Sequence, residues 1–206
     1  MAATKEHPMQ ALEAYLPSGT FENVVHYLHH HKVHLTVTRE RKSVLGDYRN
    51  AVQGKNHRIT VNGNLNKFAF LITLLHELAH LLTYEKFGHR VGAHGKEWKY
   101  IYSNMLAEFV NTKIFPADIE NELRRSFNNP AASSCAEEGL TRILRNYDEP
   151  KINIKLIEEL PKGAYFVIKD GRIFQKGDRL RKRFRCKEKS TGLLYLFSPV
   201  YEVKPI

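Results

Sequence analysis

The longest apolar pattern in the chain predicts a buried helix over residues 66–84, NKFAFLITLLHELAHLLTY. On a helical wheel, leucine, isoleucine, alanine or phenylalanine occupies nearly every side of this segment, and most of these residues are good helix formers. Asn64 or Asn66 is placed to cap the helix N-terminus, and Gly88 is placed to end the helix. A helix that is apolar almost all round is expected inside a core.

Three short runs upstream of this helix have the pattern of β-strands. Valine and leucine alternate with polar residues in the first run, which is the period of a half-buried strand. The runs cover Val33–Arg39, Val44–Arg49 and His57–Val61. A helical pattern over residues 8–31, broken near Pro17, precedes them. We expect a short meander beside the buried helix, an α+β arrangement in which an edge strand can align an extended peptide.

The succession of predicted helices and strands divides the chain into three parts. We expect a first domain at residues 1–115, a connector at residues 116–150 and a second domain at residues 151–206. The middle part predicts two short polar helices that form a connector. Pro116 is placed to begin the first of these helices, and Ser133 or Ser134 is placed to cap the second.

The last part predicts a small domain of β-hairpins. Its expected turns are Asp170-Gly171, Lys176-Gly177-Asp178 and Thr191-Gly192. Cys186 is expected as a buried strand residue. A core of this size is marginal, so the domain needs apolar side chains at most of its inward positions.

The formal net charge of +10 is concentrated in the same part of the chain. Residues 151–206 carry 14 Lys and Arg against 6 Asp and Glu. The densest run predicts either an ordinary solvated face or a nucleic-acid contact, with Phe174 and Phe184 as possible stacking rings. The candidate contacts to nucleic acid are Lys176, Arg179, Arg181, Lys182, Arg183 and Arg185.

Cysteine content and apolar segments bear on the cellular compartment. The chain has two cysteines, Cys135 and Cys186, and no C-x-x-C pair, which excludes a disulfide framework and a cysteine zinc ribbon. We find no signal-peptide pattern and no membrane-spanning segment. The expected location is the cytoplasm, with association to the nucleoid if the protein is bacterial, and no membrane contact.

The buried helix carries the pattern H-E-x-x-H in His76, Glu77 and His80. Residues four apart share a helix face, so both imidazoles can bind one metal ion. Zinc suits imidazole, and a catalytic zinc has three protein ligands and an open position for water. Glu77 can reach that position as a general base. The alternative is a core helix whose histidines are merely hydrogen-bonded, but burial in an apolar helix favours a metal partner.

A third ligand is expected downstream, where several residues compete. His94 lies in a glycine-flanked loop before a new helix, which lets the backbone approach a metal closely. His89 is the rival in the same loop, and Glu97 and Glu108 are carboxylate rivals on the following helix. The H-x-x-G-x-x-H continuation of the metzincins is absent.

Three sequence elements together resemble the SprT-like zinc metalloproteases, a family that includes Spartan, which degrades DNA–protein crosslinks. These elements are LLHELAH, AHGKEW, similar to the family's H-G-x-x-[WF] element, and VLGDYR, similar to its L-G-x-[YC] strand. The resemblance covers about residues 21–110. It implies one Zn²⁺ on His76, His80 and His94, with Glu77 as the base, and it favours His94 over His89.

The resemblance also implies a fold and further partners. The fold would be a small zincin-type α+β metalloprotease domain with the H-E-x-x-H helix in its core. The C-terminal hairpins resemble a metal-free counterpart of the family's zinc ribbon. The function would be a zinc endopeptidase that cleaves proteins bound to or near DNA, with the basic C-terminal part holding the DNA.

Two other functions fit the same sequence. One is a nucleic-acid-binding adaptor whose zinc is structural, and the other is a zinc peptidase with no role at DNA. No residue is singled out as an oxyanion donor, although Tyr84, Arg90, Tyr100 and Tyr102 are candidates.

Overall fold

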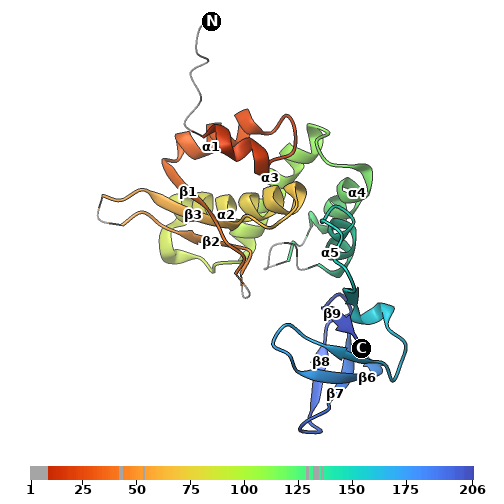
Figure 1. Ribbon diagram of the computed structural model, residues 1–206. Helices are drawn as coiled ribbons and strands as arrows, with labels where there is room; N and C mark the ends of the chain where they lie inside the picture. Colours follow the sequence, from red (N-terminus) through yellow and green to blue (C-terminus); the bar gives the residue numbers. More distant parts are fainter. Residues whose placement is uncertain (1–8, 42–43, 53, 129, 132–134, 136) are drawn as a thin grey trace, which may run out of the picture. The chain divides into compact units, whose positions relative to one another are not determined.

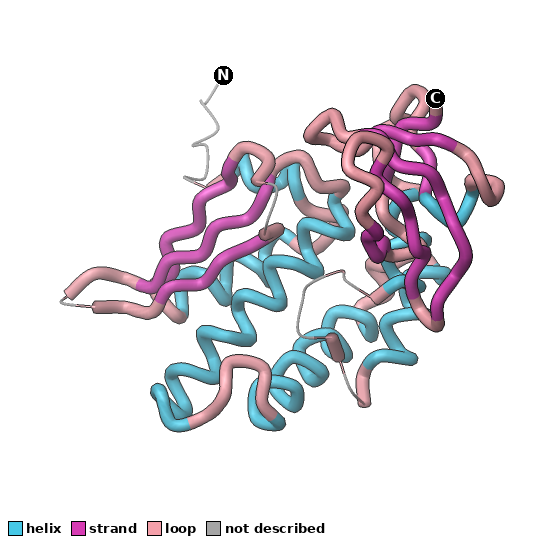
Figure 2. The backbone as a smooth tube through the Cα atoms, turned by 90° about the horizontal axis from the view of Figure 1, so that it is seen from below, coloured by secondary structure: helices cyan, strands magenta, loops and turns pink. Residues whose placement is uncertain are grey.

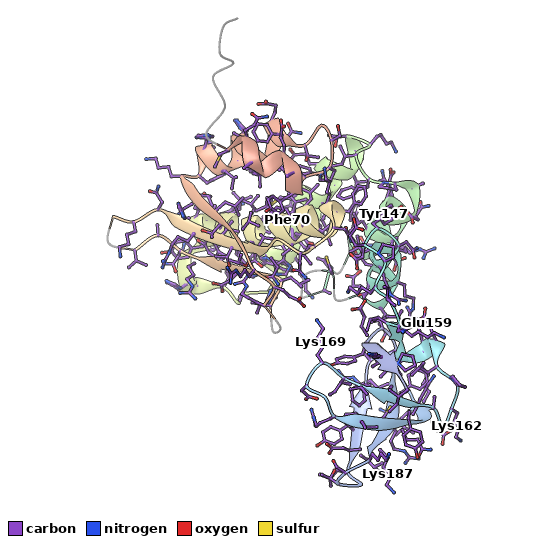
Figure 3. The ribbon with its side chains drawn as sticks, in the orientation of Figure 1. Phe70, Tyr147, Glu159, Lys162, Lys169 and Lys187 are labelled. Atoms are coloured by element: carbon purple, nitrogen blue, oxygen red, sulfur yellow. The ribbon has the colours of Figure 1, made fainter. Side chains whose placement is uncertain are left out.

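The computed structural model describes residues 9–41, 44–52, 54–128, 130–131, 135 and 137–206. The chain divides into two units, Met1–Asp148 and Glu149–Ile206. Helix α2 (Lys67–Phe87) is the centre of the first unit, and 13 of its 21 residues are buried. Phe70, labelled in Figure 3, is fully buried in this core. The predicted buried helix is therefore confirmed.

Both ends of α2 follow from local chemistry. The Asn66 side chain accepts a hydrogen bond of 2.9 Å from the Ala69 N–H, which satisfies one free amide of the first turn. The same side chain donates to the carbonyl oxygen of Leu144 and to Asp148 Oδ1, at 2.9 and 2.7 Å. Gly88 ends the helix with φ of +60°, a conformation that glycine adopts without strain.

A three-stranded sheet lies against α2 (Figures 1 and 2). Its strands are β1 (Val33–Thr38), β2 (Gly46–Arg49) and β3 (His57–Asn62). The order is β1-β3-β2, with β1 parallel and β2 antiparallel to β3, so the predicted meander is wrong. The difference in burial between β3 and β2 explains this strand order. β3 buries Ile59 and Val61 and takes the centre, whereas no residue of β2 is buried and β2 stays at the edge.

The remaining helices complete the first core. They are η1 (Gln10–Tyr15), α1 (Phe21–His30), η2 (Gly88–Arg90), α3 (Lys96–Asn111), α4 (Ala117–Ser126) and α5 (Glu138–Arg145). Ile119, Leu123, Leu140 and Leu144 join α4 and α5 to the same hydrophobic cluster as α2. Pro116 precedes α4 as predicted, and Ser133 and Ser134 lie outside the described residues.

The second unit contains one sheet and its own core. The strands are β4 (Lys155–Leu156), β5 (Tyr165–Val167), β6 (Ile173–Leu180), β7 (Arg183–Glu188), β8 (Leu194–Phe197) and β9 (Glu202–Pro205), with η3 (Ile157–Glu159) after β4. Their order is β4-β9-β5-β6-β7-β8, and all the pairs are antiparallel. Phe166, Phe174 and Cys186 are fully buried at its centre, so the prediction for Cys186 is confirmed.

The turns of this unit agree with the sequence at two of three positions. Gly171 and Gly192 lie in connections between strands, with φ of +88° and +73°. The predicted turn at residues 176–178 is wrong, because these residues form a register shift within β6. A Cβ on Gly177 would collide with the Arg185 carbonyl oxygen, so glycine is needed where the strands bulge toward each other. The chain reverses instead after β6, where Arg181 has φ of +51°.

Within the described residues, no helix is long and apolar enough to cross a membrane.

Candidate metal centre

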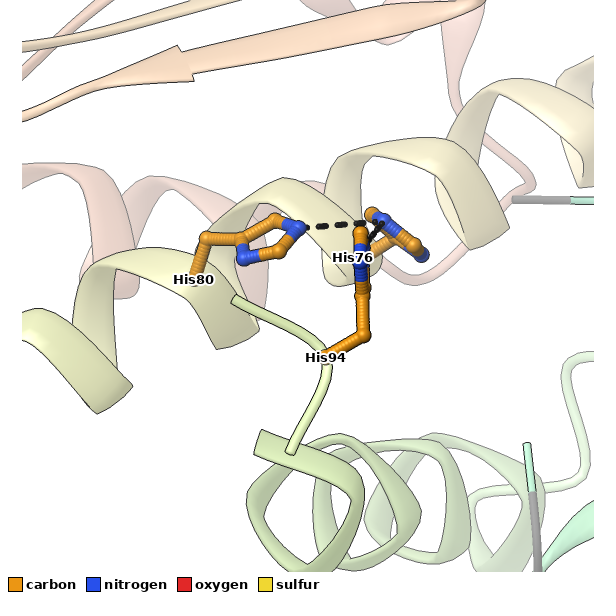
Figure 4. Close-up of side chains that lie close together, drawn as sticks. All are labelled: His76, His80 and His94. Carbon is orange, nitrogen blue, oxygen red and sulfur yellow. Dashed lines mark hydrogen bonds between the residues drawn. The ribbon is translucent and has the colours of Figure 1, made fainter. Parts of the chain in front are cut away.

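Three histidines meet at α2: His76 and His80 lie on the helix itself, and His94 lies in the loop before α3 (Figure 4). His80 Nε2 lies 3.2 Å from His76 Nε2, and His94 Nε2 lies 3.4 Å from the same atom. One ligand atom from each residue falls within 4.8 Å of the other two. The structure thus brings together the three residues that the sequence singled out as metal ligands.

The spacing of these nitrogens fits a zinc ion. In a tetrahedral site with Zn–N bonds of about 2.0–2.1 Å, two ligand nitrogens lie about 3.3–3.4 Å apart. The two separations at His76, 3.2 and 3.4 Å, are close to this value. Within the described residues this is the single group of three or more His, Cys, Asp or Glu side chains arranged to hold a metal ion. The described residues therefore offer three protein ligands to a metal ion.

Trp98 holds the rings of the three histidines in place. It is fully buried on α3, and its ring centroid lies 4.7, 5.2 and 4.7 Å from those of His76, His80 and His94. The His94 loop is closed by a 3.0 Å hydrogen bond from the Gly95 N–H to the Gly92 carbonyl. The short loop and the indole together set the approach of His94 to α2.

Burial keeps the imidazoles neutral, as metal binding requires. Burial, and to a smaller extent the neighbouring histidines, lowers the pKa of His76 from 6.5 to about 3 and that of His80 to about 4. The pKa of His94 is lowered mainly by burial as well. Because protons and metal ions compete for the same nitrogens, neutral rings favour the metal at physiological pH.

Glu77 lies on α2 beside the cluster, and the edge strand β2 surrounds its carboxylate. The side chain accepts a hydrogen bond from the Tyr48 backbone N–H. Burial, and then the charge of Asp47, raises its pKa from 4.5 to about 8, while Arg41 and the Tyr48 N–H act in the opposite direction. A carboxyl group with a pKa near neutrality can both accept and return a proton.

A cleft of about 640 Å³ opens in front of these groups. Its walls are the β2 strand and the stretch before it, the exposed side of α2, and the loop that carries His94. All three histidines and Glu77 line it, together with Tyr48 and Tyr84. The metal cluster is therefore accessible from one side and covered by protein on the other.

The rival ligands lie outside the cluster and have other contacts. The His89 ring packs edge-on against Tyr84, with centroids 5.1 Å apart. Glu97 lies 4.0 Å from the Lys96 ammonium, and Glu108 accepts a 2.8 Å hydrogen bond from the Tyr27 hydroxyl. None of the three belongs to the group of histidines that could hold a metal ion.

Tyr48, which lines the cleft, also belongs to a polar array that the sequence did not predict. The Tyr48 hydroxyl lies 2.9 Å from His57 Nδ1, which also accepts from the Ala51 N–H. His57 Nδ1 is therefore an acceptor, and its proton is on Nε2, 3.8 Å from Glu85. The Tyr48 ring lies parallel to that of His80, at 6.5 Å. These residues are distant in the sequence, and no motif spacing joins them.

The oxyanion candidates are in very different places. Tyr84 lines the cleft, whereas Tyr100 is 68% exposed on α3. Tyr102 is buried, with its hydroxyl 3.5 Å from the Ile72 carbonyl oxygen, and Arg90 Nε donates to the Phe87 carbonyl at 3.0 Å. Tyr84 is thus the single member of this set that lines the cleft.

The basic residues of the second unit separate into two groups. Arg179, Arg181, Lys182, Arg183 and Arg185 are exposed. Lys176 is 6% exposed, and its ammonium donates to the Leu160 carbonyl at 2.5 Å and lies 4.1 Å above the Phe184 ring. Lys176 therefore serves the core of this unit and is not placed to contact nucleic acid.

Comparison with known proteins identifies the family to which the chain belongs. The chain matches the model of the SprT-like family over residues 14–120, slightly more than half of its length. The chain belongs to the SprT-like family, and the resemblance noted in the sequence is confirmed.

Relatives in bacteria support the same assignment. Protein SprT of Shigella boydii serotype 18 is 35% identical over 91 residues, which are 42% of this chain and 53% of the relative. Protein SprT of Escherichia coli strain K12 is 38% identical over 77 residues, 37% of this chain and 44% of the relative. The chain thus spans about half the length of these curated relatives. No solved structure gives a significant match.

Proposed function

We propose that this protein is a zinc-dependent endopeptidase that cleaves proteins bound to or near DNA. The observation that carries the proposal is the histidine cluster with Glu77 beside it, open to a cleft. His76, His80 and His94 would hold the ion, and the nitrogen spacing supports zinc. The domain would be of the zincin type.

The chain's own groups divide the chemistry between them. A zinc ion held there would polarise the scissile carbonyl and make water acidic enough to attack at neutral pH. Glu77 takes the proton of the attacking water and returns it to the leaving amine. Its raised pKa suits both transfers, and the Tyr48 N–H fixes the direction of the carboxylate.

The substrate would enter as an extended chain along β2. This strand lies at the edge of its sheet and lines the cleft beside the histidines. An edge strand pairs with a peptide through its backbone, which accepts many sequences. Such a cleft suits a protease whose targets are chosen by location.

DNA would supply that location through the basic residues of the second unit. Arg179, Arg181, Lys182, Arg183 and Arg185 are exposed at or near the β6–β7 turn. Phosphate contacts by such groups make affinity fall steeply with salt. The proposed cellular location is the cytoplasm, in bacteria at the nucleoid.

The test of this proposal is Glu77→Gln. The amide keeps the shape of the side chain but cannot accept the proton, so we expect at least a 100-fold loss of cleavage of a DNA-binding protein, with zinc stoichiometry unchanged. The matched control is Glu85→Gln, a carboxylate on the same helix that pairs with His31. Undiminished cleavage by Glu77→Gln would show that the proposed base is wrong.

The alternatives differ in measurable ways. An adaptor with structural zinc needs four protein ligands, whereas three side chains cluster among the described residues. A zinc peptidase without a DNA role would cleave protein normally yet show no salt-dependent binding of an oligonucleotide. Deleting residues 151–206 would then leave its cleavage of DNA-bound protein unchanged.

A further inference from the structure

Strand β8 forms one edge of the second unit's sheet and carries apolar side chains in the open. It is the last strand in the sheet order, and among the described residues it pairs with β7 alone. Leu194 and Leu196 on the strand, and Leu193 just before it, are 62%, 54% and 58% exposed. Three neighbouring leucines with more than half their surface in water form a patch that soluble proteins usually cover.

The edge also lacks the features that normally prevent edge pairing. Natural edge strands carry lysine or proline, or contain a bulge. The strand Leu194–Phe197 contains no charge and no proline, and its register with β7 is regular. Its backbone is therefore available to another strand.

Cations flank these leucines on the same face. Arg185 is the cross-strand partner of Leu196, and Lys187, labelled in Figure 3, is the partner of Leu194. Both are exposed. The single acidic residue of β7 and β8, Glu188, is buried. Strands β7 and β8 thus present leucine and positive charge without an exposed carboxylate, and the nearby Asp178 of β6, which interacts with Arg185, is paired with Lys162.

We propose that the β8 edge binds an extended acidic peptide of a partner protein, added to the sheet as a further strand. Apolar side chains of the peptide would cover Leu194 and Leu196, and its carboxylates would face Arg185 and Lys187. Charge decides among the possible occupants. A second copy would bring together two units that each carry net +8 over residues 151–206, and phosphates gain nothing from leucine.

This site has no residue in common with the proposed peptidase cleft, and it shares only Arg185 with the set proposed to hold DNA. It would give the protein a docking contact that recognises a peptide through its backbone and its alternating charge. The partner would present a segment in which Asp or Glu alternates with Val, Ile or Leu. Its recruitment would not depend on cleavage.

The test uses a fluorescein-labelled ten-residue peptide alternating Glu with Val, and the full chain carrying Glu77→Gln so that the probe is not cut. We expect binding by fluorescence anisotropy. N-methylation of alternate peptide amides should weaken binding at least tenfold, since strand addition needs those N–H groups. Leu194→Ser with Leu196→Ser should also weaken it at least tenfold. The control is Leu180→Ser, which changes an exposed leucine outside β8 (45% exposed) and should alter the affinity less than twofold.

Several results would overturn the proposal. Equal binding of the N-methylated peptide would exclude strand addition, and equal binding of a Lys–Val analogue would exclude charge recognition. No binding of the Glu–Val peptide would exclude the site itself. Self-association in sedimentation that the leucine changes abolish would assign the edge to a second copy, and a loss of oligonucleotide affinity would assign it to nucleic acid. Unchanged thermal melting of the variants confirms that they fold, and the N-methylated probe tests the wild-type edge directly.

Discussion

Gly46 and Glu77 meet so closely that only glycine fits between the edge strand and the helix. A Cβ on Gly46 would lie 2.6 Å from Glu77 Oε1 and 2.8 Å from Thr73 Cγ2. This contact lets β2 approach α2 until the Tyr48 N–H reaches the carboxylate. Glu77, the proposed base, can therefore reach the Tyr48 N–H only because residue 46 has no side chain.

Gly46→Ala tests this contact. The added methyl group should push Glu77 away from its position, and a displacement of about 1 Å in a catalytic group costs on the order of 100-fold in rate. We expect that loss in peptide cleavage, with zinc affinity nearly unchanged because no histidine moves. Gly92→Ala is the control in the same cleft, since its Cβ would meet nothing closer than 3.9 Å. Equal activity of the two variants would refute the role of the contact.

His94 and His89 provide a test of the ligand set. His94→Ala removes one of three metal nitrogens and should lower zinc affinity at least 100-fold, measured by competition with a chromophoric chelator. His89→Ala should change it less than threefold, because His89 packs on Tyr84 outside the cluster. A larger loss of zinc affinity in His89→Ala than in His94→Ala would identify His89 as the third ligand.

The buried titratable groups predict how the stability of the chelator-treated protein depends on pH. Between pH 8 and 6.5, Glu77 with its pKa of about 8 takes a proton in the folded chain but not in the unfolded chain, so stability rises as pH falls. Below pH 6.5, His76 and His80 take protons only when unfolded, and stability falls again. The lowered pKa values of His57 and His94 add to this fall.

The free energy of unfolding, measured with urea at pH 5.5, 6.5 and 8 in the presence of chelator, should therefore be highest near pH 6.5. Glu77→Gln should remove the decline on the alkaline side and leave the acid side, because the amide does not titrate. A wild-type profile that rises steadily to pH 8 would contradict the burial of Glu77.

Lys176 and Arg181 should separate stability from binding. Lys176→Met keeps the volume but leaves the carbonyls of Glu158 and Leu160 without their donor, so the second unit should lose about 1–3 kcal/mol of stability in urea unfolding. Its affinity for an oligonucleotide should have an unchanged salt dependence. Arg181→Ala should do the opposite, with the slope of log K against log salt reduced by about one and stability unchanged.

The sequence predicted correctly those features that depend on residues close together in the chain. The Asn66 cap, the apolar helix and the H-E-x-x-H face follow from spacing along one helix. The loop made His94 one of several candidates, and the resemblance to the family favoured it over His89; the structure places His94 at the cluster. The sequence therefore located the site from residues close together in the chain.

Long-range pairing was not accessible in the same way. Nothing local shows that β3 lies between β1 and β2, or that Lys176 faces inward at a bulge. The contact of Gly46 with Glu77 and the Tyr48–His57 hydrogen bond join separate elements through packing. Such contacts depend on tertiary structure, which single-sequence patterns do not encode directly.

The most direct test of an open zinc site built by three imidazoles is a crystal structure of the zinc-loaded protein, with anomalous diffraction recorded at the zinc absorption edge. We predict one ion bound by Nε2 of His76, His80 and His94 at about 2.0–2.1 Å, with one solvent ligand and Glu77 beside it. A closed site with a fourth protein ligand, or an ion that His94 does not touch, would contradict the account.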